Sequence, residues 1–279
     1  MDWFRTTGIA GWYDSRLAPV SYNFGMPAAN STTRFSDRVE NYVRYRPGYP
    51  REVVQLLRRE CGLARDQAVA DIASGTGIWT RMLLETGARV FGVEPNAGMR
   101  QAGENQLASY QNFTSVAGTA EETNLPDRFV HLVTAAQAGH WFDRARARHE
   151  FVRILQPGGW LALIWNERET GATAFLREYE QLLLTYGSDY EKVRHEHTTA
   201  SVNEFFDPQT FQERDFAMAQ EFDYAGLEGR LLSSSYAPKQ GEPKHAPMLA
   251  ELGSLFDRHQ QDGKVFVSYR TRVFYGQMR

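Results

Sequence analysis

The segment from Val69 to Met99 constrains the fold of this chain more than any other, and it reads VADIASGTGIWTRMLLETGARVFGVEPNAGM. An apolar run ends in Asp71, a turn of small residues follows at 73–77, and a helix-like run leads to a second apolar strand that ends in Glu94. The two glycines of the turn let the backbone bend sharply and let a ligand approach the main chain. The segment therefore predicts a strand–helix–strand unit of a parallel sheet with a ligand site at the turn.

The acidic residues beside this turn limit the ligand that it can take. Glu94 lies where a carboxylate can accept hydrogen bonds from both hydroxyls of a ribose. Asp71 adds negative charge, which would repel a pyrophosphate and attract an ammonium or a sulfonium. Thr80 stands where the dinucleotide pattern G-x-G-x-x-G needs its third glycine. These residues favour S-adenosylmethionine (SAM) over NAD as the cofactor.

The run from Asp71 to Gly77, followed by Glu94, resembles motifs I and II of class I SAM-dependent methyltransferases, although Ala73 replaces the first glycine of D-x-G-x-G-x-G. The resemblance implies a doubly wound, Rossmann-like α/β fold with a seven-stranded sheet and an antiparallel last strand. It implies that SAM is bound here and leaves as S-adenosylhomocysteine (SAH). The cofactor-binding residues that it implies in this region are Asp71, Ala73, Ser74, Gly75, Thr76, Gly77, Glu94, Pro95 and Met99.

Two further segments carry the same resemblance. The loop after the third predicted strand would hold the adenine through Ala120 and Glu121. In related enzymes a YRPGYP segment covers the cofactor, which implies that Tyr45 covers it here and that Arg46 pairs with its carboxylate. From the residues alone, an exposed acidic loop and a contact between a helix and a loop remain the alternatives.

The fourth predicted strand runs into the sequence QAGHWF at 137–142. This resembles the Q-A-x-H-W-F element of the methyltransferase type 11 subgroup that includes trans-aconitate methyltransferase-like proteins. The resemblance implies that Gln137 and Ala138 line the cofactor, that His140 exchanges a proton near the acceptor, and that Trp141 contacts the acceptor. A packed histidine bonded to the backbone is the alternative for His140.

Alternating strands and helices up to the fifth strand, at 160–165, predict a parallel sheet with helices on both faces. Strand-like pieces at 211–224 and a strand at 263–276 would form the antiparallel pair at one edge. The intervening residues 226–262 are too many for a hairpin, so we interpret them as an inserted helical substrate cap. The methyltransferase domain would span 31–279.

Residues 1–30 form an N-terminal extension, interpreted as a lid or as a non-native start. Asn166 at the end of the fifth strand and Tyr236 in the insertion are further candidate acceptor contacts, and Tyr236 is also a candidate catalytic residue. The sequence His195-Glu196-His197 has no third ligand at a useful spacing, so no metal site is predicted.

The composition of the chain limits the kinds of binding partner that we expect. The 279 residues carry a net charge of −3 without a basic run, so nucleic acid is not expected as a partner. The single cysteine, Cys61, excludes a disulfide within the chain and fits a reducing cytoplasm. No apolar run reaches spanning length, so no membrane association is expected. The expectation is a cytoplasmic monomer or homodimer acting on a small molecule.

Three functions remain open from the sequence. The first is methyl transfer to a small-molecule carboxylate, hydroxyl or amine by in-line displacement, which needs positioning more than a protein nucleophile. The second is SAM or SAH binding without transfer, because binding and turnover share the same motifs. The third is an NAD-dependent oxidoreductase on a similar sheet, which the missing third glycine disfavours.

Overall fold

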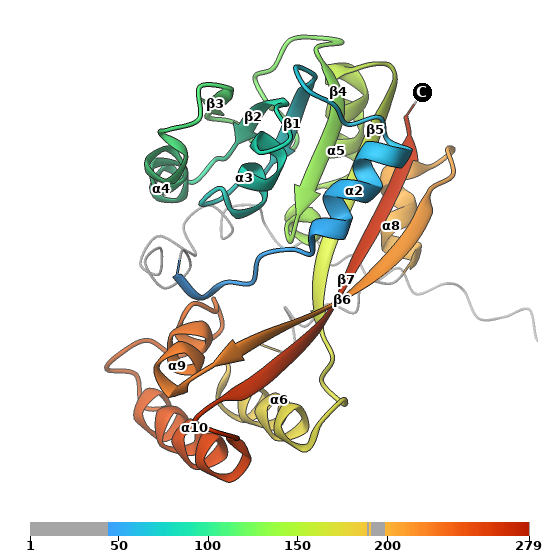
Figure 1. Ribbon diagram of the computed structural model, residues 1–279. Coiled ribbons are helices and arrows are strands. Elements are labelled where there is room, and N and C mark those ends of the chain that lie inside the picture. The colour runs from blue at the N-terminus through green and yellow to red at the C-terminus, as the bar shows by residue number, and fades with distance from the viewer. Residues whose placement is uncertain (1–43, 189, 191–198, 279) are drawn as a thin grey trace, which may run out of the picture.

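The computed structural model describes residues 44–188, 190 and 199–278. The predicted N-terminal extension and the sequence His195-Glu196-His197 lie outside the described residues. Element labels follow Figure 1.

The described residues build one seven-stranded sheet with the strand order β3-β2-β1-β4-β5-β7-β6 (Figure 1). The strands are β1 Ala68–Ile72, β2 Arg89–Val93, β3 Phe113–Val116, β4 Val130–Ala136, β5 Leu155–Arg168, β6 Gln212–Phe222 and β7 Val265–Gln277. Strands β1 to β5 run parallel to one another, whereas β7 runs antiparallel to both β5 and β6. The predicted doubly wound sheet with an antiparallel last strand is therefore confirmed.

Helices cover both faces of this sheet. They are α2 Arg51–Glu60, α3 Ile78–Leu84, α4 Ala97–Leu107, α5 Arg144–Ile154, α6 Ala174–Tyr186, α8 Thr199–Phe206, α9 Tyr224–Leu232 and α10 His245–His259. One apolar cluster joins the sheet to Phe151 of α5 and Phe205 of α8, and a second joins it to Leu56 of α2 and Leu83 of α3. Strand β1 is buried along its whole length, as expected for a central parallel strand covered on two faces.

The long strands β6 and β7 run past the edge of the parallel strands and end against α6, α9 and α10 (lower part of Figure 1). We call these three helices and the strand ends packed on them the helical lobe. Its apolar cluster includes Leu183 of α6, Leu227 of α9, Leu252 of α10 and Val267 of β7. The predicted helical insertion is thus confirmed, but the lobe also recruits α6, which precedes β6 in the chain.

Two elements differ from the sequence-based expectation. Strand β5 begins at Leu155, whereas the fifth strand was expected only at 160–165. The added first residues of β5 are irregular: the register between β4 and β5 shifts between Val130 and Leu132, as at a β-bulge. Gly158 of this stretch has a φ of 76°, which glycine adopts readily. Helix α8 was not predicted at all.

Candidate functional site

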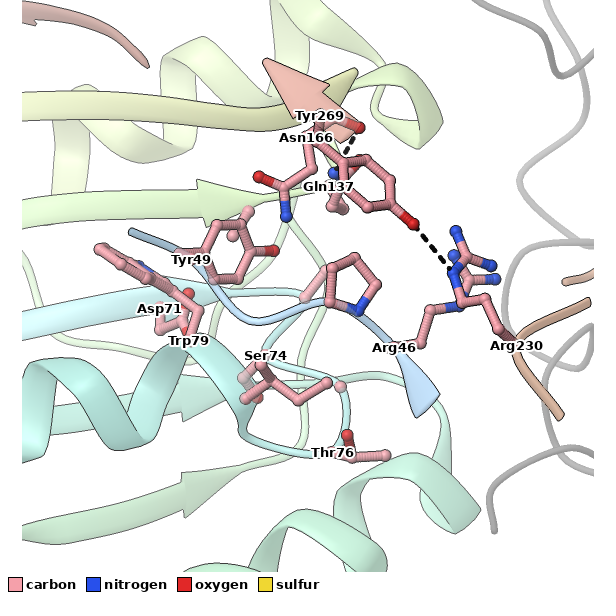
Figure 2. Close-up of a pocket in the computed structure, with 15 residues that line it drawn as sticks. Arg46, Tyr49, Asp71, Ser74, Thr76, Trp79, Gln137, Asn166, Arg230 and Tyr269 are labelled. Carbon is pink, nitrogen blue, oxygen red and sulfur yellow. Dashed lines mark hydrogen bonds between the residues drawn. The ribbon is translucent and has the colours of Figure 1, made fainter. Parts of the chain in front are cut away.

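A pocket opens beside the carboxyl ends of β1 and β4. The chain continues from β1 toward one edge of the sheet and from β4 toward the other, so this is the switch point at which open α/β sheets bind ligands. Its lining comprises Arg46, Pro47, Tyr49, Asp71, Ala73, Ser74, Gly75, Thr76, Ile78, Trp79, Ala136, Gln137, Asn166, Arg230 and Tyr269 (Figure 2).

The turn after β1 has the left-handed backbone that its small residues allow. The φ angles are 54° at Ala73, 58° at Gly75 and 85° at Gly77. Ser74 N donates to Val93 O at 3.1 Å, which attaches the turn to β2. A Cβ on Gly103 of α4 would lie 3.0 Å from Gly75 O, so α4 packs directly against the turn. The backbone that faces the pocket is therefore fixed from two sides.

Glu94 lies behind the turn and is not among the pocket-lining residues. Its two carboxylate oxygens accept hydrogen bonds from Gly75 N at 2.9 Å and from Asn96 N at 2.8 Å. Asn96 in turn caps α4 by accepting a hydrogen bond from Met99 N at 2.9 Å. Burial raises the pKa of Glu94, and the two amide donors oppose that rise. Glu94 thus ties the turn to α4.

Asp71 is 1% exposed, yet it belongs to the pocket lining. It accepts hydrogen bonds from Thr80 Oγ1 at 2.6 Å and from Thr134 Oγ1 at 3.2 Å. Trp79 Nε1 donates to the same Thr134 hydroxyl at 3.2 Å, which orients it. Burial raises the pKa of Asp71 to about 7 against the effect of both hydroxyls. This carboxyl group therefore changes charge near neutral pH.

The raised pKa of Asp71 predicts a pH dependence of ligand binding. In the unfolded chain the carboxyl ionises near pH 3.8, so its contribution to stability is fully present below that pH and is lost as pH rises through 7. A ligand ammonium favours the ionised form, so SAH affinity should rise about tenfold between pH 6 and pH 8. Calorimetry on Asp71→Asn should give a flat profile, and identical profiles for the two proteins would contradict this placement.

The segment before α2 connects the pocket to the helical lobe. Arg46 lines the pocket, and its Nη2 donates to Ser233 O at 2.9 Å, just after α9. A Cβ built on Gly229 of α9 would lie 2.1 Å from Tyr45 Cε2, so the Tyr45 ring packs directly on that helix. The contacts described for Tyr45 and Arg46 are thus with the lobe, and their predicted cofactor contacts remain predictions.

The close contact between Tyr45 and Gly229 can be tested by overpacking. Gly229→Ala should displace the Tyr45 ring and lower the free energy of unfolding by about 1–3 kcal/mol, measured by thermal denaturation. Gly253→Ala on α10 is the matched control, because its Cβ would meet Tyr224 only at 3.8 Å. That control should be neutral or slightly stabilising. Equal stability of the two variants would mean that Tyr45 does not pack on α9.

The structure brings Gln137 and Asn166 together at the ends of β4 and β5. Gln137 has a φ of 59°, and its Nε2 donates to Asn166 O at 3.1 Å. The Asn166 amide donates to Gly48 O at 2.9 Å and accepts from Thr271 Oγ1 at 2.6 Å. Both side chains line the pocket with fixed orientations.

Several predicted site residues lie outside the lining. Glu121 accepts a hydrogen bond from Asp143 N at 2.9 Å, and Ala120 is buried. His140 and Trp141 pack together in the short helix Gly139–Trp141, with ring centroids 4.8 Å apart. The Tyr236 ring lies 4.7 Å from the Tyr190 ring. Other predicted residues outside the lining are Gly77, Pro95, Met99 and Ala138.

Seven pocket residues were missed from the sequence: Pro47, Tyr49, Ile78, Trp79, Ala136, Arg230 and Tyr269. The last two are the polar ones that come from the helical lobe: Arg230 comes from α9 and Tyr269 from β7. In the antiparallel pairing of β5 and β7, Tyr269 is the register partner of Arg168. A sequence signal for Arg230 did exist: it is the only cationic residue in the helix segment YAGLEGRLL, whose one other charged residue is Glu228. Arginine is almost never fully buried unless it is paired, so a buried arginine on an amphipathic helix indicates a partner or a ligand.

The pocket chemistry fits SAM. The buried Thr76 hydroxyl lines the pocket and has no hydrogen-bond partner within the described residues, so it is available to a polar ligand. The turn places no lysine or arginine where a pyrophosphate would need one, and it lies beside the acidic Asp71. Tyr49 and Trp79 supply flat apolar walls, with ring centroids 5.2 Å apart.

Neither a metal site nor a membrane helix is found in the described part of the chain. No group of three or more His, Cys, Asp or Glu residues there is placed to hold an ion. None of the helices in the described ranges combines the length and the apolarity that crossing a bilayer requires.

Comparison with known proteins agrees with the geometry. Residues 70–163 match a family model described as a methyltransferase domain. An uncharacterized methyltransferase of Mycobacterium tuberculosis (strain ATCC 25618 / H37Rv) is 38% identical over 160 residues, which cover 57% of this chain and 61% of that relative. The match therefore spans about three fifths of the relative's length.

Solved structures share the fold. A candidate type II methyltransferase of Anaeromyxobacter dehalogenans superposes with a TM-score of 0.60 at 22% identity, over 84% of this chain and 98% of that one. Phosphoethanolamine N-methyltransferase 2 of Haemonchus contortus, in complex with phosphomonomethylethanolamine and SAH, superposes with a TM-score of 0.53 at 14% identity. That superposition covers 90% of this chain and 59% of the Haemonchus chain.

The strand order and the turn after β1 define a Rossmann-like methyltransferase fold. Together with the family match at residues 70–163 and the 38% identical relative, they support a class I SAM-dependent methyltransferase.

Proposed function

We propose that the protein transfers a methyl group from SAM to a small-molecule acceptor by in-line displacement. The observation that carries the proposal is the pocket at the switch point, where the turn at 73–76 faces Asp71 with no basic side chain on the turn. That arrangement suits an amino acid–nucleoside cofactor and disfavours a dinucleotide.

When bound, SAM supplies an activated methyl group, so the protein need not provide a nucleophile. The turn and Asp71 would hold the cofactor, and Glu94 would accept hydrogen bonds from its ribose. Gln137 and Asn166, whose amides are fixed by hydrogen bonds, would position the acceptor. The aromatic walls exclude water from the reacting centre.

The proposal extends to the acceptor side of the pocket. The helical lobe, with residues 226–262, is the substrate cap, because Arg230 and Tyr269 of the lobe reach the pocket. His140 and Tyr236 remain candidates for proton transfer, although neither lines the pocket as the structure has it. An acceptor that loses no proton, such as a carboxylate, needs no such base. A cytoplasmic monomer or homodimer remains the expectation from the sequence.

The proposal is tested by incubating the protein with methyl-labelled SAM and a panel of carboxylates, alcohols and amines. The expected result is acceptor-dependent release of SAH together with labelled product. Tight SAH binding without turnover across the whole panel would support the alternative of a SAM-binding protein without transfer activity.

A further inference from the structure

We infer that the acceptor carries an oxyanion, a carboxylate or a phosphate, which Arg230 binds with the Tyr269 hydroxyl beside it. The inference rests on the proposed function, because an acceptor presupposes methyl transfer. It concerns residues of the helical lobe, which neither the motifs of the sequence nor the family match at 70–163 include.

Arg230 is a buried cation that faces the pocket. The residue is 8% exposed and belongs to the pocket lining. Its Nη1 donates to Ser234 Oγ at 3.0 Å, and its Nε lies 3.4 Å from Tyr269 Oη. Within the described residues, no carboxylate lies within ion-pair distance of Arg230 and no group hydrogen-bonds its Nη2. A buried guanidinium without a counter-ion is costly, so an anionic ligand would be stabilised there.

Arg168, a second arginine of the same region, has a counter-ion among the described residues, in contrast to Arg230. Arg168 Nη2 lies 2.5 Å from Glu180 Oε2, and the two side chains are each 10% exposed. The same Arg168 nitrogen donates to Tyr190 Oη at 2.7 Å. Arg168 thus has the Glu180 carboxylate as its counter-ion, whereas within the described residues no carboxylate pairs with Arg230.

The pocket has charges of opposite sign at its two ends. Arg46 and Arg230 lie together at one end, with the Tyr269 hydroxyl directed at Arg230, whereas Asp71 lies at the other (Figure 2). Burial alone would raise the pKa of Tyr236, but the charges of Arg168, Arg230 and Arg46 and a hydrogen bond with Ser234 lower it below its usual range. The acidic end suits a sulfonium or ammonium, and the arginine end suits an oxyanion.

The test is calorimetry on the full chain saturated with SAH, titrated with succinate, with inorganic phosphate, and with neutral succinamide. We expect saturable binding of one anion and none of succinamide. Binding of succinate alone identifies a carboxylate acceptor, and binding of phosphate alone identifies a phosphate-bearing one. Arg230→Gln should weaken the anion at least tenfold and leave SAH affinity unchanged. Arg258→Gln, which removes an exposed charge from α10, should bind like the wild type.

Tyr269→Phe keeps the packing and removes one hydroxyl, so it tests the site even if Arg230→Gln fails to fold; we expect a severalfold loss of anion affinity. Binding of SAH but of neither anion would overturn the inference and leave the proposed function standing. Weaker SAH binding by Arg230→Gln, with unchanged binding of 5′-methylthioadenosine, would also overturn it, because Arg230 would then hold the cofactor's carboxylate. Failure of the wild type to bind SAH would contradict the proposed function and the inference with it.

Discussion

Replacing Gly75 with valine should lower SAH affinity at least 100-fold while the sheet stays folded. The φ of 58° at Gly75 belongs to the left-handed region, where a β-branched residue costs about 1–3 kcal/mol. The protein leaves room for a first carbon there, since a Cβ would meet Met99 Cε at 3.5 Å. The substitution should therefore weaken ligand binding more than it destabilises the fold, because the valine methyl groups would occupy the space beside the turn that the ligand needs.

Calorimetry with SAH measures this effect, and thermal denaturation shows whether the variant is folded. Gly171→Val is the control, because a Cβ at Gly171 meets nothing within 4 Å and lies away from the pocket lining. The control should bind SAH like the wild type. A folded Gly75→Val protein with wild-type affinity would mean that the cofactor does not contact this turn.

Glu94→Ala should weaken SAH binding by about 2 kcal/mol or more, which is roughly 30-fold. The truncation removes the charged acceptor that we assign to the ribose hydroxyls. It also removes the acceptor of Gly75 N and Asn96 N, so the turn and the start of α4 lose their shared anchor. Both consequences act in the same direction on affinity.

Two further variants separate these contributions. Glu94→Gln keeps one oxygen acceptor and the packing, so it should lose less affinity than the alanine variant. Glu85→Ala removes an exposed carboxylate at the end of α3 and should leave binding unchanged. Wild-type affinity in a folded Glu94→Ala protein would place the ribose elsewhere.

The parallel half of the fold could be predicted from local signals. The alternation of apolar strands and helices predicted β1 to β5. The helical lobe was predicted only in part. Its core joins α6 to α9 and α10 across β6 and β7, and such contacts between distant segments leave no periodic pattern in the chain.

For the candidate site, too, most residues at the ends of the parallel strands could be predicted from the sequence, and those from the helical lobe could not. The turn residues, Asp71, Gln137 and Asn166 were predicted because each lies at or just past the carboxyl end of a strand, and parallel strands end at one edge of a sheet. Arg230 and Tyr269 reach the pocket through the antiparallel pairing of β7 with β5 and β6, which depends on register over the whole pair. Glu94 was predicted as a ligand contact, and the structure adds its bonds to the turn and to α4.

The measurement that tests the central claim most directly is calorimetric titration of the purified protein with SAH, with NAD as the control. The account predicts micromolar binding of one SAH per chain and no binding of NAD. Binding of NAD without SAH would contradict it and would support an oxidoreductase, and absence of SAH binding would remove the basis for the site described here.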